Sequence, residues 1–163
     1  MPISSNIEIR RAGIPDAHTV AKILVDSFRE YESLYTPLGF AATTPKAEQV
    51  SVRMQEGPVW IATYGSQPVA TVAAMLKSNC AYMRGMAVLP AARGLGVGGQ
   101  LLKHVEGWAS GQHCDRLFLN TTPFLAAAIA LYEKSGFRRT PDPPQDLFGT
   151  PLLTMEKTIL SNI

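Results

Sequence analysis

The run of glycines at 94–99 limits the fold of this chain more than any other feature of its sequence. Four of its six residues are glycine: Gly94, Gly96, Gly98 and Gly99. Glycine costs backbone entropy on folding, so such a cluster indicates that the backbone must turn tightly or approach something closely. The run lies between a predicted strand over 81–89 and the first turn of a predicted amphipathic helix over 95–110. It therefore predicts a strand–loop–helix unit in the middle of the chain.

Periodic patterns on both sides of this unit predict the other elements. The predicted strands cover 7–10, 59–63, 69–76, 81–89, 117–119 and 152–157; one helix opens at Pro15, and further helices cover 46–55, 95–110 and 124–135. Residues 65–68 predict a hairpin turn, Gly136 predicts a helix C-cap, and 32–43 is predicted to be a loop. A β-α-β-α unit after a run of antiparallel strands indicates a mixed α/β (α+β) fold, with one sheet covered by helices on both faces.

Composition narrows the class of partner and the compartment. The 163 residues carry 15 Lys and Arg against 13 Asp and Glu, a balance that favours neither nucleic acid nor a membrane surface as partner. The apolar runs 69–76 and 124–131 are far shorter than the ~20 residues of a membrane span, and 1–6 resembles no signal peptide. Cys80 and Cys114 match no metal-ligand spacing, so a reduced, cytoplasmic protein is predicted.

The glycine run and the helix after it predict a site for a phosphate or a pyrophosphate. Glycine lets several backbone N–H groups point the same way, and a helix N-terminus adds unpaired donors and the positive end of the helix dipole. Arg93 precedes the run with a guanidinium suited to phosphate. The alternative is a glycine-rich turn that binds nothing.

Dinucleotide-binding domains offer a competing interpretation, because 94–99 also satisfies G-x-G-x-x-G. In those domains the strand runs directly into the first glycine, and an acidic residue ends the next strand. Here residues 90–93 intervene, and Asp115 begins its strand rather than ending it. The run also lacks Gly-Lys-Ser/Thr, which excludes a triphosphate P-loop, so the dinucleotide module stays as a minor alternative.

Three motifs in order resemble the GNAT superfamily of N-acetyltransferases. The phosphate signature of that family, Arg/Gln-x-x-Gly-x-Gly/Ala, is matched by Arg93, Gly96 and Gly98. Residues 83–90 resemble the central strand that leads into the loop, and 128–137 resemble the family's A-x-x-L-Y-x-x-x-G-F ending. The well-matched part covers about 82–138, a third of the chain.

The resemblance implies one acetyltransferase domain over 1–163, built as three layers around a mixed, mostly antiparallel sheet that splays in its middle. It implies transfer of an acetyl group from acetyl-CoA to a primary amine through a tetrahedral intermediate. The pantetheine arm would lie in the splay between 82–89 and 116–120, and the loop amides would hold the pyrophosphate. The implied cofactor-binding residues are Met86, Ala87, Val88, Arg93, Gly94, Leu95, Gly96, Val97, Gly98, Gly99, Asn120 and Ala128.

The resemblance gives Tyr132 the role of general acid toward the leaving thiolate. The alternative is a core aromatic residue, because Leu125, Ala128 and Ile129 share its predicted helix face. Related sequences often carry Asn seven positions before the Tyr, where this chain has Leu125; Asn120 or Thr121, at the end of the preceding predicted strand, is the candidate substitute.

A second departure concerns the general base. Many members of the family place Glu on the central strand, but 81–88 contains no carboxylate. Candidates from loops are Glu30, Glu32 and Asp146.

The acceptor is expected between the aromatic residues Tyr31, Tyr35 and Phe40 and the loop 140–149, a setting that suits a small amine with an apolar portion. His18, His104 and His113 lie far apart, so no metal is predicted. Two other functions remain open: a non-catalytic acyl-CoA sensor and a protein or peptide N-acetyltransferase. A homodimer is common among similar proteins and is also left open.

Overall fold

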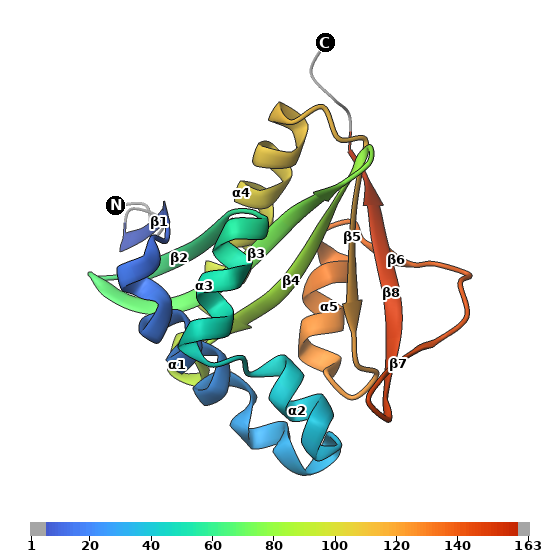
Figure 1. Ribbon diagram of the computed structural model, residues 1–163. Helices are drawn as coiled ribbons and strands as arrows, with labels where there is room; N and C mark the ends of the chain where they lie inside the picture. The colour runs from blue at the N-terminus through green and yellow to red at the C-terminus, as the bar shows by residue number, and fades with distance from the viewer. Residues whose placement is uncertain (1–5, 160–163) are drawn as a thin grey trace.

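A computed structural model describes residues 6–159 as an open sheet with helices on both faces (Figure 1). The strands are β1 (Ile7–Arg11), β2 (Val59–Tyr64), β3 (Gln67–Lys77), β4 (Cys80–Val88), β5 (Arg116–Thr121), β6 (Arg138–Arg139), β7 (Gln145–Leu147) and β8 (Thr150–Thr158). The helices are α1 (Ala17–Phe28), α2 (Pro37–Thr43), α3 (Ala47–Glu56), α4 (Val97–Gly111) and α5 (Ala126–Lys134), with a 3-10 helix (Arg29–Leu34) between α1 and α2. The predicted α/β class is confirmed.

The sheet has the strand order β1-β2-β3-β4-β5-β8-β6, and β7 pairs with β8. Every pair is antiparallel except β4 with β5, which are parallel because α4 crosses over between them. The mixed, mostly antiparallel sheet is therefore confirmed. Between β2 and β3, Gly65 and Ser66 have φ of +56° and +74°. Two successive left-handed residues are what a two-residue type I′ hairpin requires.

The parallel pairing of β4 with β5 stops partway along the strands. It runs from Cys80 opposite Arg116 to Met83 opposite Leu119, and no later residue of β4 pairs with β5. Beyond this point the two strands diverge like the arms of a V (Figure 1). The splay expected between these strands is confirmed.

A β-bulge in β4 lies where the pairing stops. On β3, Val72 alone separates Thr71 from Ala73, but their partners on β4, Ala87 and Arg84, are separated by two residues. The extra residue is accommodated by Gly85, whose φ is +61°. Because a bulge bends its strand and increases the local twist, it turns the end of β4 away from β5.

Each face of the sheet has its own apolar core. Helices α1 and α3 cover one face of the sheet, and α4 and α5 cover the other (Figure 1). On the side of α4, Leu101, Leu102 and Val105 are buried as the helical spacing predicts. None of the helices within residues 6–159 has the length and apolar character needed to cross a bilayer.

The prediction of a loop over 32–43 is wrong, because the 3-10 helix continues to Leu34 and α2 follows it. Thr36 caps α2 by accepting the N–H of Gly39 at 3.0 Å, and Pro37 occupies the first helical turn. Pro37 and Gly39 suggest a loop in the sequence, but in the structure Pro37 starts α2 and Gly39 allows a close contact. The loop 140–149 is also partly ordered, since β7 lies within it.

Gly39 lets α2 pack directly against the β7–β8 hairpin. The Thr36 hydroxyl donates to the carbonyl oxygen of Phe148 at 2.7 Å, and the Thr36 N–H donates to the Thr150 hydroxyl at 3.0 Å. A Cβ built at Gly39 would lie 2.4 Å from the Thr150 hydroxyl oxygen and 3.0 Å from the carbonyl oxygen of Leu147. Only glycine fits this approach.

Replacing Gly39 by Ala should separate α2 from the hairpin. The added methyl group overpacks the contact, so we expect the free energy of unfolding to fall by about 1–3 kcal/mol in urea denaturation. Gly107→Ala is the matched control: Gly107 lies in α4, and no heavy atom beyond its own stretch of helix lies within 4 Å of its added Cβ, so Ala there should stabilise the helix by about 0.5–1 kcal/mol. Equal stability of Gly39→Ala and the parent chain would contradict the contact.

Candidate active site

The space between the diverging strands is a cavity of about 750 Å³. This volume lies within the roughly 300–1,000 Å³ typical of small-molecule and cofactor sites. Of the predicted site residues, all except Leu95 line it: Met86, Ala87, Val88, Arg93, Gly94, Gly96, Val97, Gly98, Gly99, Asn120, Ala128 and Tyr132. The fold thus brings the loop of 93–99, the end of β4 and α5 around one space.

The glycines of the loop before α4 line this cavity, and the backbone N–H groups of 94–99 have no acceptor within residues 6–159. Gly94 and Gly96 have φ of +83° and +85°, and a Cβ at either would have no heavy atom within 4 Å. The N–H of Gln100 donates to the carbonyl of Gly96 at 3.2 Å, whereas the N–H groups of 94–99 have no acceptor among the described residues. Gly96 is the N-cap of α4 and offers no capping side chain. A row of free donors at a helix start suits an anion.

The guanidinium of Arg93 is held by protein groups on one side of this loop. It pairs with Glu30, donates from Nη2 to the carbonyl of Ser27 at 3.0 Å, and donates from Nε to the carbonyl of Val88 at 3.3 Å. Arg93 therefore ties the loop to the end of α1 and to β4. Its contact with a phosphate stays a prediction.

Asn120 supplies a polar group from the β5 arm of the V. Its Oδ1 accepts the hydroxyl hydrogen of Thr154 at 2.7 Å. This bond orients the side-chain amide and leaves its NH₂ group without an acceptor among residues 6–159. On the opposite arm, the β4 edge that faces β5 has no strand partner after Met83. An extended ligand could pair with this edge as an added strand does.

Tyr132 on α5 combines core packing with access to the cavity. It is 7% exposed, and its ring meets that of Phe137 edge-on with centroids 5.9 Å apart. Burial, with a smaller contribution from Tyr35, raises the pKa of the Tyr132 phenol far above its ordinary value. The phenol is therefore protonated at neutral pH, which a proton donor requires.

At the wide end of the V, Tyr31 and Tyr35 line the cavity, whereas Phe40 and Phe124, which pack against them, do not. Tyr35 meets Phe40 and Phe124 edge-on, at centroid distances of 5.8 Å and 4.9 Å, and Tyr31 lies 6.4 Å from Phe124. Tyr31 and Tyr35 line the cavity with Leu147 of β7, so the two segments expected around the acceptor do meet there.

A buried hydroxyl group also lines the cavity. The Oγ of Ser27 has no hydrogen-bond partner within residues 6–159, and Ser27 lines the cavity. A buried hydroxyl without a partner is costly, so this group is available to a bound molecule or to water.

The charged groups that line the cavity are all cationic. They are Arg53, Arg84, Arg93 and Lys134, and no Asp, Glu or His of the described part of the chain joins them. Nor do three or more His, Cys, Asp and Glu side chains within residues 6–159 form a group that could hold a metal ion. The cavity therefore attracts anionic ligands.

The three loop carboxylates considered as general bases lie outside the cavity wall. Glu30 pairs with Arg93, and Glu32 lies 3.8 Å from Arg29. Asp146 accepts the N–H of Gly149 at 2.8 Å. None of them lines the cavity.

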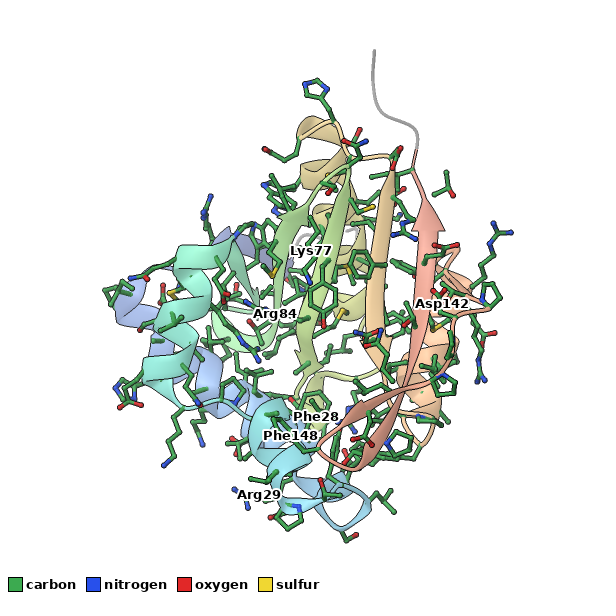
Figure 2. All side chains as sticks on the ribbon, turned by 45° about the vertical axis from the view of Figure 1, so that its right-hand side comes forward. Phe28, Arg29, Lys77, Arg84, Asp142 and Phe148 are labelled. Carbon is green, nitrogen blue, oxygen red and sulfur yellow. The ribbon has the colours of Figure 1, made fainter. Side chains whose placement is uncertain are left out.

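Sequence reasoning missed Arg53, which comes from α3. Its Nη2 donates to the carbonyl of Ala42 at 3.4 Å, and its Nη1 lies 2.9 Å from the position of a Cβ at Gly85. Burial, and secondly the charge of Arg84, lowers the pKa of Arg53. Arg84 lies on the α3 side of β4 (Figure 2) and pairs with Glu56 at 2.5 Å. No motif marks Arg53, because only the folded chain brings α3 beside the bulge.

Sequence comparison identifies the family. The family model for acetyltransferases of the GNAT family matches residues 19–137. The uncharacterized N-acetyltransferase YjgM of Escherichia coli (strain K12) is 30% identical over 135 residues, which are 79% of this chain and 80% of that protein. The chain therefore belongs to the GNAT family of acetyltransferases, and the predicted resemblance is confirmed.

Solved structures share the fold at low sequence identity. The PaiA N-acetyltransferase from Thermoplasma acidophilum, solved in complex with coenzyme A, is 20% identical, with a TM-score of 0.77 over 93% of this chain and 98% of its own. Ard1 from Thermoplasma volcanium is 21% identical, with a TM-score of 0.78 over 95% of this chain and 99% of its own. At these identities the likeness supports the fold alone.

Proposed function

We propose that this protein transfers the acetyl group of acetyl-CoA to the primary amine of a small molecule. One observation carries the proposal: a single cavity joins the free loop amides, the unpaired edge of β4, the protonated phenol of Tyr132 and an aromatic-lined end.

The residues present fit acetyl-CoA. The N–H groups of 94–99 would hold the diphosphate, helped by the positive end of the α4 dipole. The pantetheine arm would follow the β4 edge along Met86, Ala87 and Val88, with the amide of Asn120 on the other side. Gly98 permits the close packing beneath the loop, since a Cβ there would lie 2.8 Å from Leu131 Cδ2.

The chemistry follows from this placement. A neutral amine attacks the thioester carbonyl carbon, and a backbone N–H near the bulge stabilises the oxyanion of the tetrahedral intermediate. The carbonyl re-forms as the carbon–sulfur bond breaks. Tyr132 gives its proton to the departing sulfur and regains one from the nitrogen of the new amide. The products are an N-acetylated amine and the free thiol of CoA.

A small acceptor is favoured over a polypeptide by the walls at the wide end. There α2 meets the β7–β8 hairpin through Thr36, Phe148 and Thr150, next to the cavity-lining residues Tyr31, Tyr35 and Leu147. Figure 2 shows Phe28 of α1 and Phe148 at this same end. A protein or peptide acceptor needs an open groove instead, and a sensor would bind acetyl-CoA without turnover.

Release of CoA thiol from acetyl-CoA, measured across a panel of small amines and N-terminal peptides, tests the proposal. We expect amine-dependent release with small amines and a mass gain of one acetyl group on the acceptor. Tight binding of acetyl-CoA without turnover on any acceptor would indicate a sensor instead. Turnover on peptides alone would indicate a peptide acetyltransferase. Stabilisation by NAD but not by acetyl-CoA in a thermal-shift assay would overturn the cofactor assignment.

Gly96→Asp should strongly weaken the binding of acetyl-CoA, because the new carboxylate would lie at the proposed diphosphate site. We expect at least a tenfold weaker Kd by calorimetry, the size of a lost charge-assisted hydrogen bond or more. Gly96→Asn is the matched control, since Asn also tolerates a positive φ and has nearly the same shape without the charge. Unchanged affinity of Gly96→Asp would refute the anion site.

Tyr132→Phe should lower kcat by roughly 10²–10⁴-fold, the usual contribution of a positioned proton donor, with little change in the Kd for acetyl-CoA. Tyr64→Phe is the control: Tyr64 packs against the same core but does not line the cavity. A kcat close to that of the parent enzyme would contradict the role of general acid and indicate that Tyr132 is only a core aromatic residue.

A further inference from the structure

Two arginines and one glutamate meet beside the β4 bulge. Arg84 of β4 pairs with Glu56 of α3 at 2.5 Å, and its side chain is 22% exposed. Arg53 is one helical turn before Glu56 and feels the charge of Arg84. Unlike Arg84, Arg53 forms no ion pair with any carboxylate among residues 6–159. The cluster therefore holds two positive charges against one negative charge.

The donors of this cluster are only partly satisfied. Arg53 donates one hydrogen bond, a long one of 3.4 Å from Nη2 to the carbonyl of Ala42. The Nε of Arg84 is buried and has no acceptor. A guanidinium carries five N–H donors arranged to grip a carboxylate with two bonds. Unused donors and an excess positive charge, both half-buried, leave room for one anionic partner.

The position of Arg53 directs that partner toward the reacting centre. Arg53 and Arg84 both line the main cavity. The Nη1 of Arg53 occupies the space that a side chain at Gly85 would need, 2.9 Å from the built Cβ. Gly85 is the bulge residue, at the start of the splay where the thioester is proposed to lie. An anionic group on Arg53 would thus belong to the acceptor rather than to the distant diphosphate.

We propose that Arg53, with Arg84 beside it, binds a carboxylate of the acceptor, so that the preferred acceptors are amines of the amino-acid type. The inference rests on the proposed function and narrows its substrate class. The acceptor enters with its carboxylate at the guanidiniums and its apolar portion toward Tyr31 and Tyr35. Arg53 is a binding residue in this assignment and takes no part in bond making.

The test compares each of a panel of L-amino acids with its own amide as acceptor. The amide keeps the amine and the side chain but loses the negative charge, and it also resembles a peptide N-terminus. We expect kcat/KM to favour the free acid by roughly 10- to 100-fold, as expected for one charge-assisted pair. In Arg53→Met this ratio should fall toward one, because kcat/KM for the free acids should drop far more than kcat/KM for the amides.

Arg139→Met is the matched control, because Arg139 is exposed on β6 and does not line the cavity; it should keep the parent ratio. The Kd for acetyl-CoA, measured on every variant, shows whether the fold is intact. Arg53→Glu gives a second readout. Because it replaces a positive charge by a negative one, kcat/KM in this variant should favour diamines of similar length over the free amino acids.

The outcomes separate this inference from the function on which it rests. Equal rates with acids and amides, or an acid preference that survives in Arg53→Met, would overturn the carboxylate site while leaving acetyl transfer in place. No turnover with either class, despite binding of acetyl-CoA, would overturn both.

Discussion

The loss of pairing between β4 and β5 is the constraint on which the rest of the molecule depends. Buried backbone N–H and C=O groups need partners, and the interior of a sheet is where they are usually paired. The bulge at Gly85 breaks the pairing there, so the far end of β4 keeps β3 as a neighbour and faces an open space on the other side. That space is the cavity, and an extended ligand along β4 would restore the missing partner of the strand.

The distribution of charge then divides the cavity into two regions. The free amides of 94–99 lie at the start of α4 and suit a diphosphate, while Arg53 and Arg84 lie at the bulge. Arg93 is not a free cation in either region, because its guanidinium pairs with Glu30 and donates to two backbone carbonyl groups. It joins the loop to the end of α1 instead. Both regions would thus suit anions, as proposed for the diphosphate and for a carboxylate of the acceptor.

The sequence alone predicted those parts of the fold that depend only on residues near one another in the chain. The glycine run, the hairpin turn and the apolar stripe of α4 each follow from neighbouring residues, and each is found in the structure. The segment 32–43 was predicted wrongly because α2 depends on the Thr36 cap and on the distant β7–β8 hairpin. Arg53 was missed for the same physical reason: its partners at Gly85 and Arg84 are more than thirty residues away in sequence.

The absence of a lining carboxylate changes how the amine can lose its proton. An ammonium group in a half-buried space beside Arg53 and Arg84 is disfavoured by both burial and like charge, and both effects lower the pKa of the amine. Burial acts in the opposite direction on Tyr132, whose pKa it raises. In the proposed reaction, these two effects would favour an unprotonated nucleophile and a protonated acid, which is the arrangement that acyl transfer to an amine requires. If a carboxylate of the acceptor pairs with Arg53, it weakens the repulsion only in part, because Arg84 and its Glu56 partner remain beside it. In the proposed reaction the acceptor would bind through its anion and react through its neutral amine, so no carboxylate of the protein is needed to deprotonate the ammonium group.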